Sequence, residues 1–470
     1  MSDDDEGLGD ISNIIELANF TAKQVPLLTE DSAALAFAER YRGQFLFDHD
    51  AKSWFRWTGQ HWTQERTRLA FEWARQLVRD LGENEVIKVK GLSRKTCFTN
   101  GVEKFAQADR IFAVAEQDWN KDPYLLATAG GTVDLRTGQV RAADPADRIN
   151  KITAATPLEV AECPRWYAFL AEATGKDDEL IAFLQRWCGY CLTGDIREHA
   201  LVFCYGPGGN GKTVMLNTIS AILGGYAVTA AMETFTASQF ERHPTDLAML
   251  CGARLVSASE TEEGRAWAEN KIKQITGGDP ITARYMRCDF FTYHPTFKLM
   301  IIGNHEPTLR NVDDAARRRF NVVPFLRKPQ LVDKQLPNKL HDEWPGILRW
   351  MIDGCLAWQA EGLAPPETVR AATTSYFDNQ DIFSQWLEEK CNAVPGDREK
   401  TAPSADLFAS WSAFAKAAGE TPGSRKSFAR LLERKGFQPY RRGDKKRTRA
   451  WYGIYVWPES HGYGYGAEDD

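Results

Sequence analysis

The sequence predicts an α/β protein, and three observations support that fold class. Short apolar runs typical of buried strands, "ALVFCY", "ARLVSAS", "FKLMII" and "FNVVPF", lie between residues 198 and 330. A glycine-rich turn joins the first of these runs to a helical pattern, "KTVMLNTISAIL". Near the C-terminus, two amphipathic helical patterns precede a basic hairpin pattern. We therefore expect an α/β core between a helical or mixed N-terminal region and a C-terminal winged-helix domain.

Composition and charge are those of an ordinary globular chain of roughly two to four domains. The 470 residues are 43% hydrophobic and 26% charged. No apolar run is long enough to span a membrane, and the acidic start, "MSDDDEGLGD", is unlike a signal peptide. The nine cysteines show no paired framework, which is typical of a reducing compartment. We expect a cytoplasmic protein whose net charge of −6 excludes a uniformly basic surface but not a local basic patch.

Two residue pairs invite a metal interpretation, and each has a simpler one. Cys188 and Cys191 lie in an apolar helical pattern with no second pair at zinc spacing, which favours core packing over metal or redox chemistry. Asp48 and Asp50 lie between the aromatic runs of "QFLFDHDAKSWFRW", which predict a β-hairpin. Aspartate is a good turn former, and no nearby acidic or histidine cluster completes a divalent-metal site. A turn is therefore the favoured role for these aspartates.

The stretch "GPGGNGKT" fits the phosphate-binding pattern G-x-x-x-x-G-K-[ST]. Glycines let the backbone curl so that N–H groups point at a phosphate chain, and the following helix presents its positive dipole end to the same anion. Lys212 would lie along the β- and γ-phosphates, and Thr213 would offer its hydroxyl to Mg²⁺. The flanking strand and helix patterns support this over an ordinary loop. We expect ATP with Mg²⁺ at Gly206, Pro207, Gly208, Gly209, Asn210, Gly211, Lys212, Thr213 and Val214.

Polar residues follow the next two apolar runs and add candidate catalytic groups. Glu260 follows "ARLVSAS" and is the first choice for polarising the attacking water and holding the Mg²⁺ water shell, with Glu262 as the reserve. Such strands commonly end in two adjacent acids, and Ser259 takes the first of those places here. Asn304 ends "FKLMIIGN", where an amide could bond the γ-phosphate or the water; the alternative is a simple turn former.

Three arginines, Arg317, Arg318 and Arg319, stand just before the run "FNVVPF". They could be a solvated helix end. An arginine on the edge of one subunit can also stabilise charge on a neighbour's γ-phosphate, and an ATPase completed in this way must form a ring or a filament.

The order of "LTGDIREHALVFCYGPGGNGKT", "SASETEEG", "IKQITGGDPITAR", "MIIGN" and "RRRFNVVPF" resembles the superfamily 3 helicases. The similarity is to the phage and plasmid primase-helicase branch, related to the poxvirus primase-helicase, and runs from about residue 116 to 460. It implies an AAA+-like ATPase core that forms a ring, usually hexameric, with ATP between subunits. It also implies translocation on single-stranded DNA, typically 3′ to 5′.

The resemblance assigns roles by position. Lys212 and Thr213 would bind nucleotide, Glu260 would be the catalytic acid and Asn304 the sensor. Arg319 would be the arginine finger, with Arg318 second. Only about 115 residues precede the similar region and they hold no convincing catalytic acid set, so we expect no primer synthesis and a separate primase or polymerase partner.

Two segments are candidates for DNA contact. The segment "NKIKQITGGDPITARYMRCDFF" carries Lys273, Arg284, Tyr285 and Arg287, which suit a channel that tracks a single strand, although an exposed hairpin with ordinary charges explains any one of them equally well. The C-terminal helix and hairpin patterns carry a strongly basic set, for which the alternative is a solvated charged face. Its candidate DNA-binding residues are Arg425, Lys426, Arg430, Arg441, Arg442, Lys445, Lys446 and Arg447.

These patterns divide the chain into seven parts. We expect an acidic flexible arm (1–30), a mixed α/β N-terminal region (31–115), a family-specific region with collar-like helices (116–197), the ATPase core (198–330), a helical region (331–378), the winged-helix domain (379–460) and a tail (461–470).

The function expected from this combination is an ATP-dependent DNA helicase. It would serve replication of a phage, plasmid or integrated element in a bacterial cytoplasm. Two alternatives remain open: an initiator or loader that uses ATP only as an assembly switch, and a defence ATPase triggered by nucleic acid.

Overall fold

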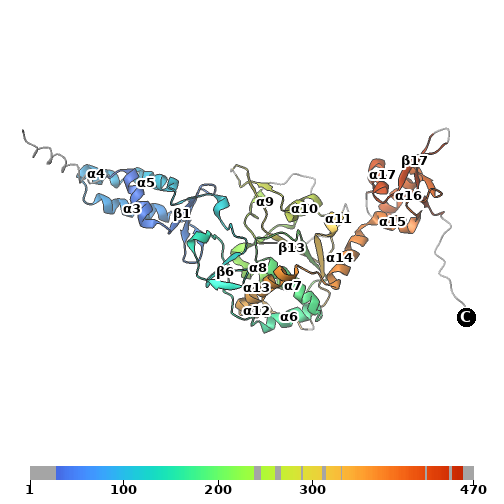
Figure 1. The fold of residues 1–470 in the computed structure, drawn as a ribbon, viewed down its shortest axis with the longest axis horizontal. Helices are drawn as coiled ribbons and strands as arrows, with labels where there is room; N and C mark the ends of the chain where they lie inside the picture. Colours follow the sequence, from blue (N-terminus) through green and yellow to red (C-terminus); the bar gives the residue numbers. More distant parts are fainter. Residues whose placement is uncertain are drawn as a thin grey trace, which may run out of the picture.

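The computed structural model describes residues 28–237, 245–259, 266–286, 289–307, 309, 314–329, 331–418, 421–443 and 447–458. Three bodies lie in a row, as Figure 1 shows: an N-terminal body with helices α3 to α5, a central α/β body, and a C-terminal body that α14 joins to the centre. Among the described residues, no helix is both long and apolar enough to span a membrane.

The N-terminal body packs four helices against a four-stranded sheet. The helices are α2 (Glu30–Tyr41), α3 (Leu69–Gly82), α4 (Ile87–Ser93) and α5 (Thr96–Ala108). The sheet order is β3 (Trp62–Gln64), β2 (Ser53–Trp57), β1 (Phe45–Asp48) and β4 (Ala113–Val114). Aromatic rings fill the space between the layers, with Phe37, Trp54 and Phe112 in mutual edge contacts.

The predicted hairpin is present, with Asp48 opposite Ser53 in the β1–β2 register. Asp48 is 2% exposed. One of its carboxylate oxygens accepts from the backbone N–H groups of Asp50 and Ala51, both at 2.9 Å, and the other accepts from the Trp119 indole at 2.7 Å. The turn interpretation of Asp48 is confirmed, because its oxygens serve the turn and the packing of Trp119.

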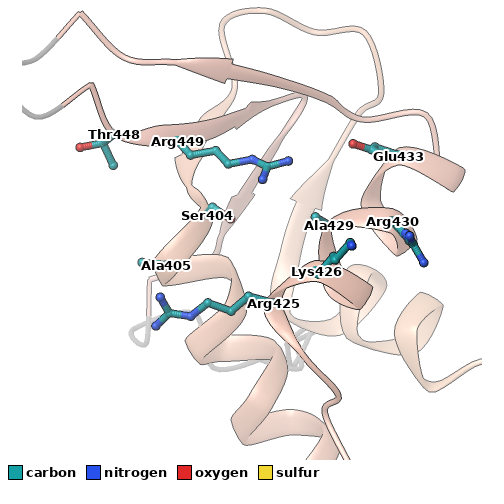
Figure 2. A pocket seen from close by; sticks show the side chains of 9 residues that line it. All are labelled: Ser404, Ala405, Arg425, Lys426, Ala429, Arg430, Glu433, Thr448 and Arg449. Carbon is teal, nitrogen blue, oxygen red and sulfur yellow. The ribbon is translucent and has the colours of Figure 1, made fainter.

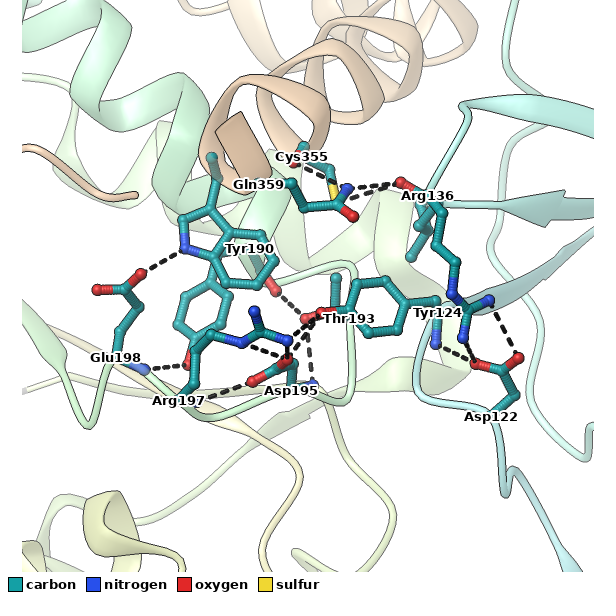
Figure 3. Close-up of polar contacts among 12 residues, drawn as sticks. Asp122, Tyr124, Arg136, Tyr190, Thr193, Asp195, Arg197, Glu198, Cys355 and Gln359 are labelled. Carbon is teal, nitrogen blue, oxygen red and sulfur yellow. Dashed lines mark hydrogen bonds and ion pairs between the residues drawn. The ribbon is translucent and has the colours of Figure 1, made fainter. Parts of the chain in front are cut away.

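A second, three-stranded sheet begins the central body: β5 (Leu125–Thr128), β6 (Gly131–Asp134) and β7 (Gln139–Arg141). Helices α6 (Pro164–Thr174) and α7 (Asp178–Tyr190) follow it. The polar contacts in Figure 3 join this sheet to the loop before the central sheet. Tyr124 donates to the Asp195 carboxylate at 2.7 Å, and Arg197 donates to the same carboxylate at 2.7 Å.

The central sheet has five strands in the order β14 (Phe320–Pro324), β8 (Leu201–Tyr205), β13 (Lys298–Gly303), β10 (Leu255–Ser259) and β9 (Ala227–Thr229). Every neighbouring pair is parallel. The carboxyl ends of all five strands therefore meet at one edge. In an open α/β sheet, ligands bind at the carboxyl ends of the strands, at the point where the strand order reverses.

Each face of this sheet is buried by a different set of helices. Strand residues such as Val202 and Cys204 pack in one core with α7, α8 (Lys212–Leu223) and α13 (Trp344–Glu361). The alternate residues, such as Leu201 and Phe203, pack in a second core with α10 (Glu269–Gly277), α14 (Glu367–Gln380) and the hairpin of β11 (Ile281–Ala283) and β12 (Phe291–Tyr293). Burial on both faces explains the continuous apolar runs in the sequence.

Three short helices complete the central body: α9 (Thr245–Ala248), α11 (Asp314–Arg317) and α12 (Leu336–His341). Four 3-10 turns, η1 (Glu116–Asp118), η2 (Pro145–Asp147), η3 (Gly224–Tyr226) and η4 (Met232–Thr234), connect larger elements. Cys188 and Cys191 lie in the first core, and burial raises the pKa of the Cys191 thiol to about 12. The core-packing interpretation of this pair is confirmed.

The C-terminal body combines α15 (Ile382–Lys390), α16 (Ser404–Ala417) and α17 (Arg425–Arg434) with a three-stranded sheet. The sheet order is β16 (Thr401–Pro403), β18 (Arg449–Tyr452) and β17 (Gln438–Arg441), and β15 (Cys391–Ala393) pairs with β19 (Ile454–Val456). The helices α16 and α17 and the β17–β18 hairpin match the sequence pattern. The sequence did not indicate α15 or β16.

Helices α7 and α13 cross at two glycines, Gly189 and Gly354. Substitution of these glycines therefore tests how tightly the first core is packed. A Cβ on Gly354 would overlap the Gln185 carbonyl, and one on Gly189 would overlap the backbone of Cys355. We expect Gly354→Ala to lower the free energy of unfolding by about 2 kcal/mol, because the helices must separate to fit the methyl group. Urea unfolding followed by tryptophan fluorescence measures this.

The matched control is Gly91→Ala in α4, where an added Cβ meets no atom within 4 Å. Alanine favours a helix over glycine, so this control should be neutral or slightly stabilising. Equal destabilisation by both substitutions would contradict the close crossing.

Lys298 makes the free energy of unfolding of the central body depend on pH. Its side chain is buried, its ammonium donates to the carbonyls of Thr193 and Asp195, and it lies 4.8 Å from the centre of the Tyr190 ring. Burial lowers the pKa of Lys298 from 10.5 to about 7. Between these values the unfolded chain binds a proton that the folded chain lacks, so this residue makes the free energy of unfolding rise with pH.

We therefore expect Lys298→Met to flatten the increase in stability between pH 7 and pH 9.5. The difference between wild type and variant should change by up to about 1.4 kcal/mol per pH unit. Urea midpoints at pH 7, 8 and 9 measure it, and Lys416→Met, at an exposed lysine of α16, is the control. A difference independent of pH would show that Lys298 keeps its proton when buried.

Candidate functional site

The glycine-rich loop follows β8 and ends where α8 begins. Gly206, Gly209 and Gly211 have positive φ angles of 143°, 78° and 91°. A side chain at Gly206 would overlap the carbonyl of Phe325, and one at Gly211 would press on the Phe169 ring. Glycine is therefore required at these two positions both by conformation and by close neighbours. The loop curls at the N-terminus of α8, which is the geometry that favours an anion.

Lys212 lies inside this loop and is 5% exposed. Its ammonium donates to the Gly206 carbonyl at 2.6 Å, to the Asn210 side-chain oxygen at 2.9 Å and to the Pro207 carbonyl at 3.2 Å. Burial lowers the pKa of Lys212. These three acceptors are neutral oxygens, and among the described residues no carboxylate pairs with this ammonium.

A cavity of about 490 Å³ opens beside the loop. Thr213 and Asn304 both line it, so the structure brings the predicted magnesium hydroxyl and the predicted sensor amide to the loop. The position of Thr213 at the first turn of α8 fits a ligand of a nucleotide-bound cation. The remaining wall residues are Arg165, Ala168, Phe169, Glu172, Ala173, Gly208, Gly209, Asn210, Gly211, Lys212, Val214, Arg327, Pro329, Leu331, Val332, Asp333 and Leu336.

The predicted catalytic acids, Glu260 and Glu262, lie outside the described residues. The strand before them, β10, ends at Ser259 and is the neighbour of β13, so the chain enters this segment at the edge of the sheet that carries the loop.

The three predicted arginines differ in their surroundings. Arg317 pairs with Asp378 at 3.0 Å and lies over the Phe377 ring at 5.3 Å. Arg319 is half-buried and donates to the Ala315 carbonyl at 2.6 Å. Arg318 is exposed. All three precede β14, and its register pairs Phe320 with Leu201 and Pro324 with Tyr205. The cluster therefore lies at the sheet edge opposite the glycine-rich loop.

The predicted channel segment contains the β11–β12 hairpin. Arg284 lies over the Phe290 ring at 4.8 Å, and Tyr285 stacks on Phe291 with ring centres 5.5 Å apart. Phe290 is 60% exposed and Met286 is 71% exposed. These two apolar residues give the hairpin an exposed tip that the sequence interpretation missed. Lys273 is half-buried on α10, away from this hairpin in sequence, and Arg287 lies outside the described residues.

The C-terminal body holds a basic hollow, shown in Figure 2, of about 590 Å³. Its lining residues are Ser404, Ala405, Arg425, Lys426, Ala429, Arg430, Glu433, Thr448 and Arg449. Arg425 lies over the Phe408 ring and Arg449 over the Trp451 ring, each at 5.7 Å, so aromatic side chains hold both guanidinium groups. Among the described residues, four cations and one carboxylate line this hollow, and no aromatic residue does.

Arg425, Lys426 and Arg430 are thus brought together as predicted, and Arg449 joins them from β18. Arg441 and Arg447 are exposed and Arg442 is half-buried, all on the hairpin beside the hollow. Lys445 and Lys446 lie outside the described residues.

The sequence interpretation missed two walls of the cavity beside the loop. One is α6, whose Phe169 packs on Gly211, and the other is the segment from Arg327 to Leu336 after β14. The helical pattern of α6 was visible in the sequence, but neither segment carries a phosphate-binding motif. Only the fold shows that they meet the loop.

Comparison with known families covers both the region before the central sheet and the sheet itself. Residues 34–175 match the family described as "D5 N terminal like". Residues 204–319, from the glycine-rich loop through the arginine cluster, match a family of unknown function, DUF5906.

Curated relatives of this chain include proteins of viruses. A protein of Acanthamoeba polyphaga mimivirus, named a putative helicase, is 25% identical over 323 residues, which is 64% of this chain and 34% of that protein. A Frog virus 3 protein with the same description is 27% identical over 258 residues, 50% of this chain and 26% of that protein. The chain thus spans about a third or less of the length of these relatives. Together with the family matches, they support a relationship to D5-like proteins.

Two structures of the NrS-1 C-terminal region share the fold. They are 11% identical to this chain, with TM-scores of 0.50 and 0.51, and they cover 92% and 90% of it and 100% of their own chains. At this identity the likeness establishes the mixed α/β architecture alone.

Proposed function

We propose that this chain is an ATP-dependent DNA helicase of the superfamily 3 type, with an AAA+-like core that works as a ring. The main support is the arrangement around β14. The glycine-rich loop lies at the carboxyl end of β8, whereas Arg318 and Arg319 precede the parallel strand β14. Five residues of strand span roughly 16 Å, so these arginines cannot reach a nucleotide held by their own loop. A neighbouring subunit is the place where they would act.

Within one subunit, Lys212 would neutralise the β- and γ-phosphates and Thr213 would hold Mg²⁺, which stabilises the charge that develops during hydrolysis. Asn304 would orient the γ-phosphate or the attacking water. Glu260, which follows β10, would polarise that water. At the boundary between subunits, Arg318 is the better candidate for the arginine finger because it is exposed. Arg319 would first have to break its hydrogen bond to the Ala315 carbonyl. The relatives named as helicases support unwinding as the work that hydrolysis drives.

The C-terminal body is proposed as a winged helix that binds DNA. Its elements follow in the order α15, β15, β16, α16, α17 and the β17–β18 hairpin, that is, a helix, two short strands, two helices and a wing. The hollow between α17 and the hairpin is basic and lined by small or charged side chains. Such a surface suits sugar-phosphate backbone, whereas binding of unpaired bases typically uses exposed aromatic rings.

We expect wild-type protein to unwind tailed duplexes with multiple ATP turnovers, and a 3′ tail to be required if translocation is 3′ to 5′. Lys212→Ala, Glu260→Gln and the double variant Arg318→Ala/Arg319→Ala should each lower ATP hydrolysis at least about 100-fold and abolish unwinding. Arg110→Ala, at an exposed arginine of the N-terminal body, is the control. DNA-stimulated hydrolysis without unwinding would instead favour a loader or a nucleic-acid-triggered ATPase.

Mixing variants tests whether the site is shared. Lys212→Ala subunits retain their arginines, and the double arginine variant retains its loop. A mixture of the two should regain part of the ATPase activity, because some boundaries then join an intact loop to an intact arginine. No recovery in mixtures shown to co-assemble would exclude a finger supplied by the neighbour.

For the C-terminal body, Arg425→Ala and Arg449→Ala should each weaken binding of a 20-base-pair duplex and reduce the salt dependence of affinity by about one unit of slope. Fluorescence anisotropy across a series of NaCl concentrations measures both effects. The matched control is Arg398→Ala, an exposed arginine of the same body that does not line the hollow. Equal weakening by all three would favour a diffuse, solvated charged face.

A further inference from the structure

A glutamate at the carboxyl edge of the central sheet has no role in the site described above. Glu306 comes shortly after β13, whose last residue, Gly303, lies opposite Tyr205 at the end of β8. Asn304, in the same segment, lines the cavity beside the glycine-rich loop, whereas Glu306 does not. Glu306 therefore lies next to the proposed nucleotide site without forming part of its wall.

The segment that carries Glu306 is held in place by α14. The Tyr376 hydroxyl donates to the Pro307 carbonyl at 2.5 Å. The Gln380 side-chain oxygen accepts from the backbone N–H of Leu309 at 3.1 Å. These two contacts fix the backbone directly after Glu306, so its carboxylate keeps a defined place at this edge of the sheet.

Glu306 is half-buried, and in the described part of the chain its carboxylate makes no hydrogen bond or ion pair. Burial raises the pKa of this carboxyl. Burial and the nearby charge of Glu306 also raise the pKa of the Tyr205 hydroxyl. Partial burial of a charge without a partner destabilises the folded subunit. A cation supplied by another subunit would offset that cost.

The opposite edge of the same sheet carries a matching cation. Arg318 is exposed, and among the described residues its side chain makes no hydrogen bond or ion pair, whereas Arg317 and Arg319 are both engaged within the subunit. Because β14 and β13 are both parallel to β8, Arg318 stands before the amino end of β14 and Glu306 stands beyond the carboxyl end of β13. The two groups meet only where two subunits place these edges together.

We propose that Glu306 is a positioning residue whose carboxylate accepts the guanidinium of Arg318 from the neighbouring subunit. This inference rests on the proposed function, because assembly into a ring brings the two edges together. A guanidinium has several N–H donors in a fixed plane, so it can pair with a carboxylate and still present N–H groups to a phosphate. Glu306 then orients Arg318 toward the γ-phosphate from outside the nucleotide cavity.

The test is a double-variant cycle on steady-state ATP hydrolysis by the full chain with single-stranded DNA. We expect Glu306→Gln to lower kcat about tenfold with little change in the KM for ATP, because the arginine loses its acceptor while the cavity stays intact. In an Arg318→Ala background, the same substitution should have no further effect. Glu306→Asp keeps the charge and should lower kcat less. Equal losses from Glu306→Gln in both backgrounds would overturn the pairing.

Mixed subunits show whether the two groups act between chains. Glu306→Gln subunits keep Arg318, and Arg318→Ala subunits keep Glu306. A co-assembled mixture therefore contains boundaries with both groups and should hydrolyse ATP faster than the mean of the two variants alone. Hydrolysis at or below that mean, in mixtures shown to co-assemble, would contradict a pair formed between subunits.

Urea unfolding separates this role from a structural one. The midpoint for Glu306→Gln should equal or exceed that of wild type, because the neutral amide removes the cost of a half-buried charge. A substitution that lowers kcat without lowering the midpoint acts on the boundary between subunits, which is the outcome expected here.

The controls distinguish failure of this inference from failure of the proposed function. Glu389→Gln, at an exposed glutamate of α15, should change neither kcat nor KM. Unchanged kcat in Glu306→Gln, with hydrolysis lost in Lys212→Ala and in Arg318→Ala/Arg319→Ala, overturns the pairing and leaves the proposed function standing. Full hydrolysis by the last two variants would overturn the proposed function as well.

Discussion

The parallel register of β8 between β14 and β13 is the constraint on which the rest of the central body depends. It aligns the ends of three strands, so that the glycine-rich loop after β8 has Asn304 after β13 on one side and Phe325 after β14 on the other. The same register places the start of β14 at the far edge. One pattern of backbone hydrogen bonds thus both assembles the phosphate end of the site and separates it from the arginine cluster.

The loop also contacts the end of the strand that follows those arginines. The Asn210 side chain donates to the Phe325 carbonyl, and its oxygen accepts from Lys212. Phe325 also donates its backbone N–H to Tyr205. Replacement of the Lys212 contacts by a phosphate would therefore act on Asn210 and, through it, on the end of β14. These contacts join the loop to the carboxyl end of β14.

Helix α14 extends that route toward the C-terminal body. It packs on β14, accepts the Arg317 guanidinium at Asp378 and ends one residue before Asp381. Asp381 in turn pairs with Lys435, which follows α17, at 2.9 Å. These contacts join the arginine edge, through α14, to the C-terminal body that holds the basic hollow. In the proposed helicase, α14 is the element that would couple the DNA-binding body to the subunit boundary.

The sequence by itself determined the local features that depend on short stretches of residues. A phosphate-binding loop was predicted from Gly206, Gly211, Lys212 and Thr213, because the backbone conformations of such a loop require glycine. Buried strands were predicted from the continuous apolar runs, because a strand that is buried on both faces needs apolar residues at every position. The basic helix and hairpin near the C-terminus could also be predicted, because their patterns and their positive charges lie within one short stretch of sequence.

Only the tertiary structure decided which distant segments meet. It placed Phe169 and Val332 on one cavity with the loop, added Arg449 to the basic hollow, and gave Arg317, Arg318 and Arg319 three different environments. No motif predicts these contacts or the different surroundings of the three arginines, since packing and strand register depend on contacts far apart in the chain. For the same reason, the sequence alone does not decide which of the three adjacent arginines is the proposed arginine finger. That choice rests on which of them the fold leaves exposed.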